Sequence, residues 1–262
     1  MDLSYKYFWN IKNYIPPRYV ELEGYDLLGD KTYSNRFYLK PGIASKLRAR
    51  HFEICLKLTS SYFNKSNVID FGCADGCFIP SLSSYFNHVV GIDAYPPFAD
   101  IAKILVKKMD LKDANIICNK DMKIDEVKSM LDREYNIAFC LEVLEHVGNK
   151  KNPYKGKIKL IKDISSLITD DGKIIISVPK MVGLSFLAQR FGLYIFNQWT
   201  EPISFKNLIK AGIFKDTEDL EKRWDHLHLG FNHEKLEKMI SNDFNIIKKV
   251  NDFFQVVYVV KL

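Results

Sequence analysis

The sequence predicts an α/β fold in which a mostly parallel sheet ends in an antiparallel hairpin. Five short apolar runs between Asn67 and Pro179 alternate with segments of helical periodicity. Repeated strand–helix units of this kind build a parallel sheet with right-handed crossovers. The last two apolar runs, 244–252 and 253–262, are adjacent in the chain. They must pair antiparallel, because a parallel return needs a crossover of about a dozen residues.

Each strand is predicted from an apolar run that does not alternate with polar residues, as is typical of strands covered on both faces. The five runs before the hairpin are 67–71, 88–93, 114–121, 135–143 and 173–179. Helical spacing is found at 44–62, 77–86, 97–109, 124–132, 157–168 and 232–240. The prediction is therefore a seven-stranded mixed sheet flanked by helices.

Two segments fall outside this alternation. Residues 1–47 are polar, rich in aromatics and broken by Pro16-Pro17 and Pro41-Gly42, so we expect an N-terminal helical strap or lid. Residues 48–262 are then the main domain. Within it, 180–229 is an insertion after the fifth strand, and we expect it to form a helical lid. Its apolar part, 181–196, has helical spacing. It packs on the core, lines a hydrophobic acceptor pocket or contacts a membrane surface.

Composition narrows the classes of protein. The net charge of +6 and the pI near 8.8 are lower than is typical of a dedicated nucleic-acid-binding protein. The lysine-rich run 149–162 is either a solvated face or a contact for an anionic ligand. The five cysteines show no spacing typical of zinc sites, and we predict no metal. A secretory signal and an apolar run of membrane-spanning length are both missing from the sequence, so a reducing cytoplasm is the expected location.

The stretch NVIDFGCADGCF, residues 67–78, is a glycine turn after the first strand. A dinucleotide fingerprint would have the spacing G-x-G-x-x-G, followed by an acid about 20 residues later. Here Ala74 replaces the second glycine and Gly76 comes one residue early. Asp75 would also place a negative charge beside a pyrophosphate. Both features favour a ligand without a diphosphate.

The pattern Asp70-x-Gly72-x-Ala74-x-Gly76 resembles the first motif of the class I S-adenosylmethionine (SAM)-dependent methyltransferases, which have a Rossmann-like fold. The resemblance implies that Asp70 accepts from the methionyl ammonium of SAM and that the small residues let the backbone approach it. It further implies that an acid after the second strand binds the ribose hydroxyls, and that residues after the third bind the adenine. The implied cofactor-binding residues are Asp70, Gly72, Cys73, Ala74, Gly76, Asp93, Ala94, Asp121, Met122 and Glu142.

The segment LEVLEHV, 141–147, resembles the motif after the fourth strand in a subfamily that includes ubiquinone-biosynthesis O-methyltransferases. The implied function is methyl transfer from SAM to oxygen or nitrogen of a small-molecule or lipid-like acceptor, with S-adenosylhomocysteine as the product. The insertion would be the acceptor lid. Alternatives are an RNA or nucleotide-sugar methyltransferase, a non-catalytic binding subunit of the same fold and, disfavoured by the glycine turn, an NAD-type oxidoreductase.

A histidine with a pKa near neutral suits removal of a proton from the acceptor. His146 and His228 are the candidates, and for each the alternative role is a structural hydrogen bond. We do not expect nucleic acid as a partner.

Overall fold

The computed structural model describes residues 12–17, 32–38, 43–149, 151–195, 202–222 and 228–261. All structural statements below concern these residues. Much of the expected N-terminal strap, namely 1–11, 18–31 and 39–42, therefore lies outside the described residues, as do 196–201 and 223–227 of the insertion.

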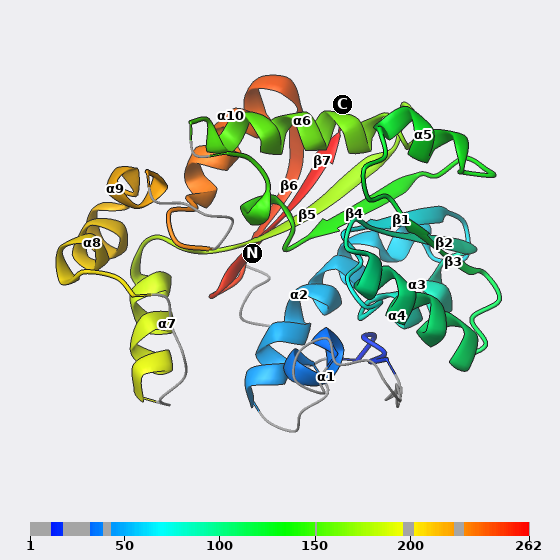
Figure 1. Cartoon of the computed structure of the whole chain (residues 1–262), viewed down its shortest axis with the longest axis horizontal. Coiled ribbons are helices and arrows are strands. Elements are labelled where there is room, and N and C mark those ends of the chain that lie inside the picture. Colours follow the sequence, from blue (N-terminus) through cyan, green and yellow to red (C-terminus); the bar gives the residue numbers. More distant parts are fainter. Residues whose placement is uncertain are drawn as a thin grey trace. The chain divides into compact units, whose positions relative to one another are not determined.

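Seven strands hydrogen-bond into one sheet in the order β3-β2-β1-β4-β5-β7-β6 (Figure 1). Their bounds are β1 Asn67–Phe71, β2 His88–Asp93, β3 Ala114–Cys118, β4 Ile137–Leu141, β5 Lys173–Pro179, β6 Asn245–Asn251 and β7 Gln255–Lys261. β1 pairs parallel with β2 and β4, and β2 pairs parallel with β3. β6 and β7 pair antiparallel. The predicted mixed sheet with a C-terminal hairpin is confirmed.

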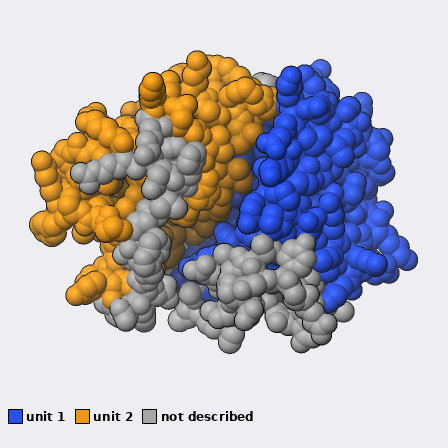
Figure 2. Space-filling model, viewed as in Figure 1, with its two compact units in different colours: residues 1–141, 164–175 blue, residues 142–163, 176–262 orange. Residues whose placement is uncertain are grey.

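The chain divides into two compact units, which are described separately (Figure 2). The first contains residues 1–141 and 164–175, and the second contains 142–163 and 176–262. β5 contributes residues to both. The expected division after residue 47 falls inside one continuous helix, α2 (Ile43–Thr59), and it stays a prediction.

The first unit holds β1 to β4 and the helices that lie before and between these strands in the chain. These are α1 Tyr33–Phe37, α2, η2 Ser60–Tyr62, α3 Ile79–Tyr85, α4 Pro96–Lys108 and α5 Ile124–Ser129. β4 is almost wholly buried, as its unbroken apolar sequence requires. α4 begins at Pro96-Pro97, where the missing proline N–H costs no helical hydrogen bond. It packs against β2 and β3.

The second unit holds the hairpin and the insertion. Its helices are η3 Leu144–His146, α7 Leu184–Ile195, α8 Phe205–Ile209, the π-helix η4 Lys210–Phe214, α9 Glu218–Glu221 and α10 His233–Asp243. α6, Pro153–Ser165, lies mostly in this unit and begins at Pro153, four residues before the expected start at 157. α7, α8 and α9 form the insertion between β5 and α10 in the chain (Figure 1).

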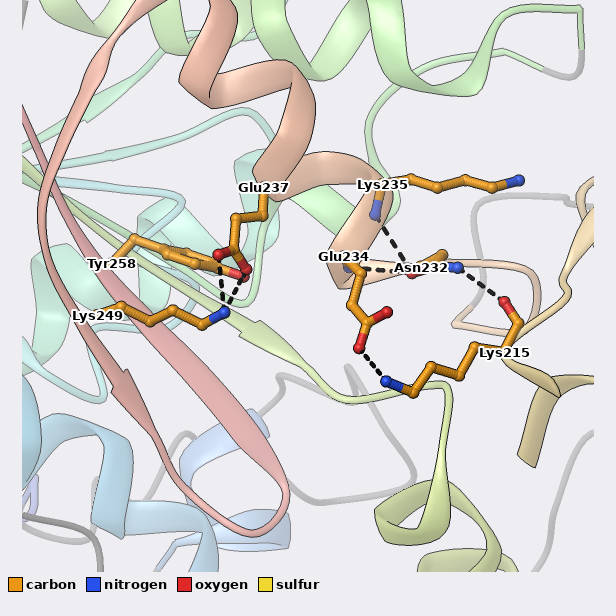
Figure 3. Close-up of polar contacts among 7 residues, drawn as sticks. All are labelled: Lys215, Asn232, Glu234, Lys235, Glu237, Lys249 and Tyr258. Carbon is orange, nitrogen blue, oxygen red and sulfur yellow. Dashed lines mark hydrogen bonds and ion pairs between the residues drawn. The ribbon is translucent and has the colours of Figure 1, made fainter. Parts of the chain in front are cut away.

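Polar contacts join the start of α10 to Lys215, the residue of the insertion that follows η4. The Asn232 side chain caps α10 by accepting the backbone N–H groups of Glu234 and Lys235 at 3.0 and 3.3 Å (Figure 3). Its amide donates to the carbonyl of Lys215, and the Lys215 Nζ lies 2.6 Å from Glu234 Oε1. The residue that follows η4 is thus held by two bonds from α10.

A second contact joins α10 to the hairpin. Glu237 on α10 accepts from Lys249 Nζ on β6 and, at 3.0 Å, from the Tyr258 hydroxyl on β7 (Figure 3). The Tyr258 ring is fully buried, so its hydroxyl needs a partner of this kind. No described helix combines the length and the apolar character that crossing a bilayer would need.

Candidate functional site

The glycine turn after β1 adopts a tight conformation that its sequence permits. Gly72 and Gly76 have φ values of 80° and 87°, and Ala74 has a φ of 49°. The N–H groups of Gly72 and Cys73 both donate to the carbonyl of Ile92, at 2.7 and 3.1 Å. A Cβ on Gly76 would lie 2.9 Å from the Leu105 side chain, so helix α4 closes this position to larger residues. The turn therefore presents backbone rather than side chains.

Asp93, at the end of β2, is bonded to this turn. Its Oδ2 accepts the Ala74 N–H at 2.8 Å and its Oδ1 accepts the Tyr95 N–H at 2.8 Å. Ala74 holds a left-handed conformation that is unfavourable for a residue with a Cβ, and the bond from Asp93 helps to hold it there. Each carboxylate oxygen retains a second lone pair, so Asp93 can still accept from ligand hydroxyls.

Asp70 lies near the end of β1 and is 3% exposed. Burial, together with the negative charge of Asp93, raises the pKa of its carboxyl to about 7. A buried carboxylate is stabilised by a cationic partner. The methionyl ammonium of SAM would be such a partner, as the resemblance implies.

The loop after β3 contains Asp121 and Met122, which were predicted to bind the adenine of SAM, and its geometry fits this role less well. β3 ends at Cys118, three residues before Asp121, so Asp121 stands in a turn rather than at the strand end, and it is exposed. The N–H of Met122 already donates to the Asn119 carbonyl at 3.1 Å. Asn119 is the better-placed polar residue, because its N–H donates to the Asp93 carbonyl and its buried Oδ1 has no hydrogen-bond partner among the described residues. The sequence reasoning missed it.

Asp75, in the glycine turn, is buried and hydrogen-bonded to Ser34 of α1. Its carboxylate accepts the N–H and the hydroxyl of Ser34, at 2.7 and 2.6 Å, and it is 2% exposed. Asp75 therefore helps to hold α1, and its effect on a diphosphate stays a prediction. Tyr14 gives a second attachment, since its hydroxyl donates to the Cys77 carbonyl at 3.1 Å. The described parts of the N-terminal segment are thus attached to the glycine turn.

Glu142 follows β4 directly and belongs to the second unit. It has a φ of 56°, and its N–H donates to the carbonyl of Ser177 on β5. The Ser177 hydroxyl donates to Glu142 Oε1 at 2.9 Å. Burial and the negative charge of Glu145 raise the pKa of Glu142 well above its usual value.

Three further side chains of the second unit meet in one cluster: Glu145, His146 and His228. Their ligand atoms all lie within 4.8 Å of one another. The rings of His146 and His228 have centroids 4.9 Å apart, and His146 Nε2 lies 3.9 Å from Glu145 Oε1. The structure therefore brings the two candidate catalytic histidines together, with a carboxyl group that the sequence reasoning missed.

The electrostatics of this cluster favour a cation. Glu145 is fully buried, and neither of its carboxyl oxygens has a hydrogen-bond partner among the described residues. Burial raises its pKa to about 8. Burial and the neighbouring His146 lower the pKa of His228 to about 4, which keeps this imidazole neutral and able to act as a ligand. A carboxylate and two imidazoles suit a divalent transition metal.

Lys157 supports the turn that carries the cluster. It is 1% exposed, and its Nζ donates to the carbonyls of Leu144, Glu145 and Val147 at 2.8, 3.4 and 2.6 Å. Burial lowers its pKa to about 8. The lysine-rich run is therefore not a uniform solvated face. Lys159 and Lys162 in the same run are exposed and ion-paired with Asp163 and Asp243.

Comparison with known proteins identifies the family. The model of a family described as a methyltransferase domain matches residues 43–236, roughly three quarters of the chain. The chain belongs to this family. Its sheet also resembles that of a SAM-dependent methyltransferase from Aquifex aeolicus, with a TM-score of 0.52, 11% identity, and coverage of 80% of this chain and 89% of that one.

The curated proteins that match this methyltransferase include ubiquinone biosynthesis O-methyltransferases. A ubiquinone biosynthesis O-methyltransferase from Rickettsia typhi is 34% identical over 94 residues, which are 36% of each protein. One from Rickettsia prowazekii is 26% identical over 215 residues, 78% of this chain and 79% of that protein. The matched part of the chain spans 36% to 47% of the length of three of these relatives. The predicted class I family is confirmed, and with it a methyltransferase that uses SAM as cofactor.

The individual site assignments stay predictions. In the first unit, Asp93 accepts a hydrogen bond from Ala74, and its charge raises the pKa of Asp70. Asp121 and Ala94 are exposed and take no part in these interactions. The Cys73 thiol is buried, so only its backbone is available to a ligand. The sequence E-x-x-E-H, 142–146, places two acids and a histidine within five residues and could have indicated the cluster.

Proposed function

We propose that this protein transfers the methyl group of SAM to an oxygen atom of a small-molecule or lipid-like acceptor. The observation that carries the proposal is the cluster of Glu145, His146 and His228, whose first residue lies four residues after the buried end of β4. The names of the relatives support oxygen as the methylated atom, since several are ubiquinone biosynthesis O-methyltransferases.

The residues of the first unit would hold the cofactor. The Asp70 carboxylate would accept from the methionyl ammonium, and the Asp93 carboxylate from the ribose hydroxyls. The backbone of Gly72 to Gly76 would lie against the amino-acid part of SAM. In methyl transfer a lone pair on the acceptor oxygen forms the C–O bond while the C–S bond breaks. Its electrons go to sulfur, which gives neutral S-adenosylhomocysteine.

The acceptor hydroxyl must lose its proton as the bond forms. His146 is the residue suited to take it, because its side chain is 43% exposed and able to reach a substrate, whereas His228 is largely buried. His228 would orient its neighbour and stay neutral. The predicted alternative for both, a structural hydrogen bond, would leave proton removal to solvent.

The same cluster could hold a divalent cation, although the sequence predicted none. The two oxygens of buried Glu145, which have no hydrogen-bond partner among the described residues, and the neutral imidazole of His228 fit such an ion. In this alternative Glu145, His146 and His228 would be its ligands, and His146 would not be the base that removes the proton. When bound, the cation would lower the pKa of a hydroxyl brought to it.

Two measurements test the proposal. Calorimetry with SAM and S-adenosylhomocysteine should show binding. If neither compound binds, the proposed methyltransferase activity is contradicted. Transfer of label from methyl-labelled SAM should be measured with a prenylated catechol, a nucleotide-sugar and an RNA as acceptors. We expect label on the catechol oxygen. Binding without transfer to any acceptor would instead favour the non-catalytic subunit.

The divalent cation needs its own test. Titration of Mn²⁺ or Zn²⁺ into the chelator-treated protein without SAM should show one site, and Glu145→Gln should abolish it. If Glu145→Gln binds the ion as well as the unaltered protein, these side chains do not hold it. Cytoplasmic location stays a prediction.

A further inference from the structure

Adjacent residues of the glycine turn are bonded to two different elements of the first unit. The N–H of Ala74 donates to Asp93 Oδ2, at the end of β2, at 2.8 Å. The carboxylate of Asp75, the next residue, accepts the N–H and the hydroxyl of Ser34 on α1, at 2.7 and 2.6 Å. One short stretch of backbone therefore connects the carboxylate proposed to bind ribose with the N-terminal segment.

This stretch of backbone has a conformation that needs support. Ala74 has a φ of 49° and Gly76 has a φ of 87°, and Asp75 stands between them in the chain. Because the left-handed region is unfavourable for alanine, Ala74 stays there only where surrounding bonds impose it. The bond to Asp93 is one such restraint on the turn, and the two bonds between Asp75 and Ser34 are another.

The bonds between Asp75 and Ser34 are strong restraints because both partners are buried. Ser34 is 5% exposed and Asp75 is 2% exposed, so water does not readily replace either partner. The side chain of Thr32 adds a further hydrogen bond to the Asp75 carboxylate. A buried carboxylate that loses a donor is left with an unsatisfied oxygen, which costs more than the loss of the same bond at the surface.

Helix α1 is itself packed on the first unit through residues before and after Ser34. The ring of Tyr33 lies 6.0 Å from that of Phe98 on α4, measured between centroids. The ring of Tyr38, directly after α1, lies 5.2 Å from that of Phe52 on α2. Aromatic pairs at these distances stabilise the packing of the elements that carry them. Ser34 therefore stands on an anchored helix and can act as a fixed support for the turn.

We propose that Ser34, acting through Asp75, is a positioning residue for SAM, because its two bonds hold the glycine turn in the conformation that binds the cofactor. The inference rests on the proposed placement of SAM against the backbone of Gly72 to Gly76. The coupling between a ligand and a bond that favours its binding conformation is reciprocal. SAM therefore strengthens the attachment of α1 as much as that attachment strengthens the binding of SAM.

Calorimetry with SAM on the full chain tests the positioning role. Ser34→Ala removes the hydroxyl donor but keeps the N–H, and it should raise the Kd for SAM about fivefold or more. Ser34→Thr restores a hydroxyl and should recover most of the affinity. Asp75→Asn changes the other partner of the same bonds, should also raise the Kd, and serves if Ser34→Ala does not fold.

A matched control removes a buried hydroxyl elsewhere in the first unit. Thr59→Val loses the bond from the Thr59 hydroxyl to the Cys55 carbonyl within α2, at 2.9 Å. This variant should lose stability in urea as Ser34→Ala does, yet bind SAM as the unaltered protein does. A Kd raised equally in Thr59→Val and Ser34→Ala would mean that lost stability, and not the position of the turn, weakens the binding.

Hydrogen exchange measures the reciprocal effect. Saturating SAM should slow the exchange of amides 32–38 at least about fivefold more than that of α10, and the difference should shrink in Ser34→Ala. Equal protection of 32–38 by SAM in the two proteins overturns the proposal. An unchanged Kd in Ser34→Ala overturns this role alone, whereas no binding of SAM by the unaltered protein contradicts the proposed function as well.

Discussion

The carboxylate of Asp93 accepts the backbone N–H of Ala74 at 2.8 Å and so joins the end of β2 to the glycine turn after β1. The same carboxylate accepts from Tyr95 on its other oxygen. Asp93 was predicted only as a ligand for ribose. In the structure it also shapes the turn, so its removal should have two consequences.

Asp93→Ala should abolish SAM binding, and Asp93→Asn should weaken it by about 100-fold, since an amide oxygen restores one acceptor without the charge. Calorimetry measures both. Asp100→Asn, which removes an exposed carboxylate of α4, is the control and should bind SAM normally. SAM affinity of Asp93→Asn within about twofold of the unaltered protein would show that this carboxylate contributes little to binding.

SAM affinity should depend on pH through Asp70. Its pKa is raised to about 7, first by burial and then by Asp93, and the methionyl ammonium needs the ionised form. Affinity should therefore fall as pH drops from about 8 to about 6, by up to tenfold per unit below the pKa. Asp70→Asn should bind weakly and without this slope. An unaltered slope in Asp70→Asn would assign the titration to another group.

The same shift has a consequence for stability without SAM. The carboxyl titrates near 3.9 when unfolded and near 7 when folded, so the folded state holds its proton to higher pH. Asp70 therefore lowers the free energy of unfolding as pH rises from about 4 to about 7. Over this range the stability of Asp70→Asn should decline less than that of the unaltered protein, in urea unfolding measured at each pH.

Ser34→Ala tests the attachment of the N-terminal segment. The change leaves Asp75 Oδ1, which is buried, without its hydroxyl donor, and this should cost about 1 to 3 kcal/mol locally. Amide hydrogens of 32–38 should exchange faster, whereas Ser60→Ala, which loses an exposed bond to Lys57, should leave them unchanged. Equal exchange in the two variants would mean that the bond between the Ser34 hydroxyl and Asp75 does not anchor α1.

The sequence predicts the fold well because its signals are local. The buried runs at β1 and β4 and the short connection of the hairpin determine strand type and pairing without long-range information. The site is predicted less well, because its contacts join distant residues. Nothing near Asp75 indicates that it binds Ser34, and nothing near His228 indicates that it meets Glu145. Lys157 belongs to a run of lysines that suggests solvent exposure, yet it is buried.

Lys157→Met should loosen the turn that carries Glu145 and His146. Methionine preserves the apolar stem of lysine but removes the donor from three carbonyls, so the free energy of unfolding should fall by about 2 to 4 kcal/mol. The control Lys155→Met lies on the same helix, where residue 155 is exposed, and should change stability by less than about 0.5 kcal/mol. Urea unfolding measures both.

Because the turn positions two of the three candidate ligands, Mn²⁺ affinity should also fall about tenfold or more in Lys157→Met. Equal stability of Lys157→Met and Lys155→Met would show that these bonds do not hold the turn, and lost stability with unchanged Mn²⁺ affinity would separate the turn from the ion site.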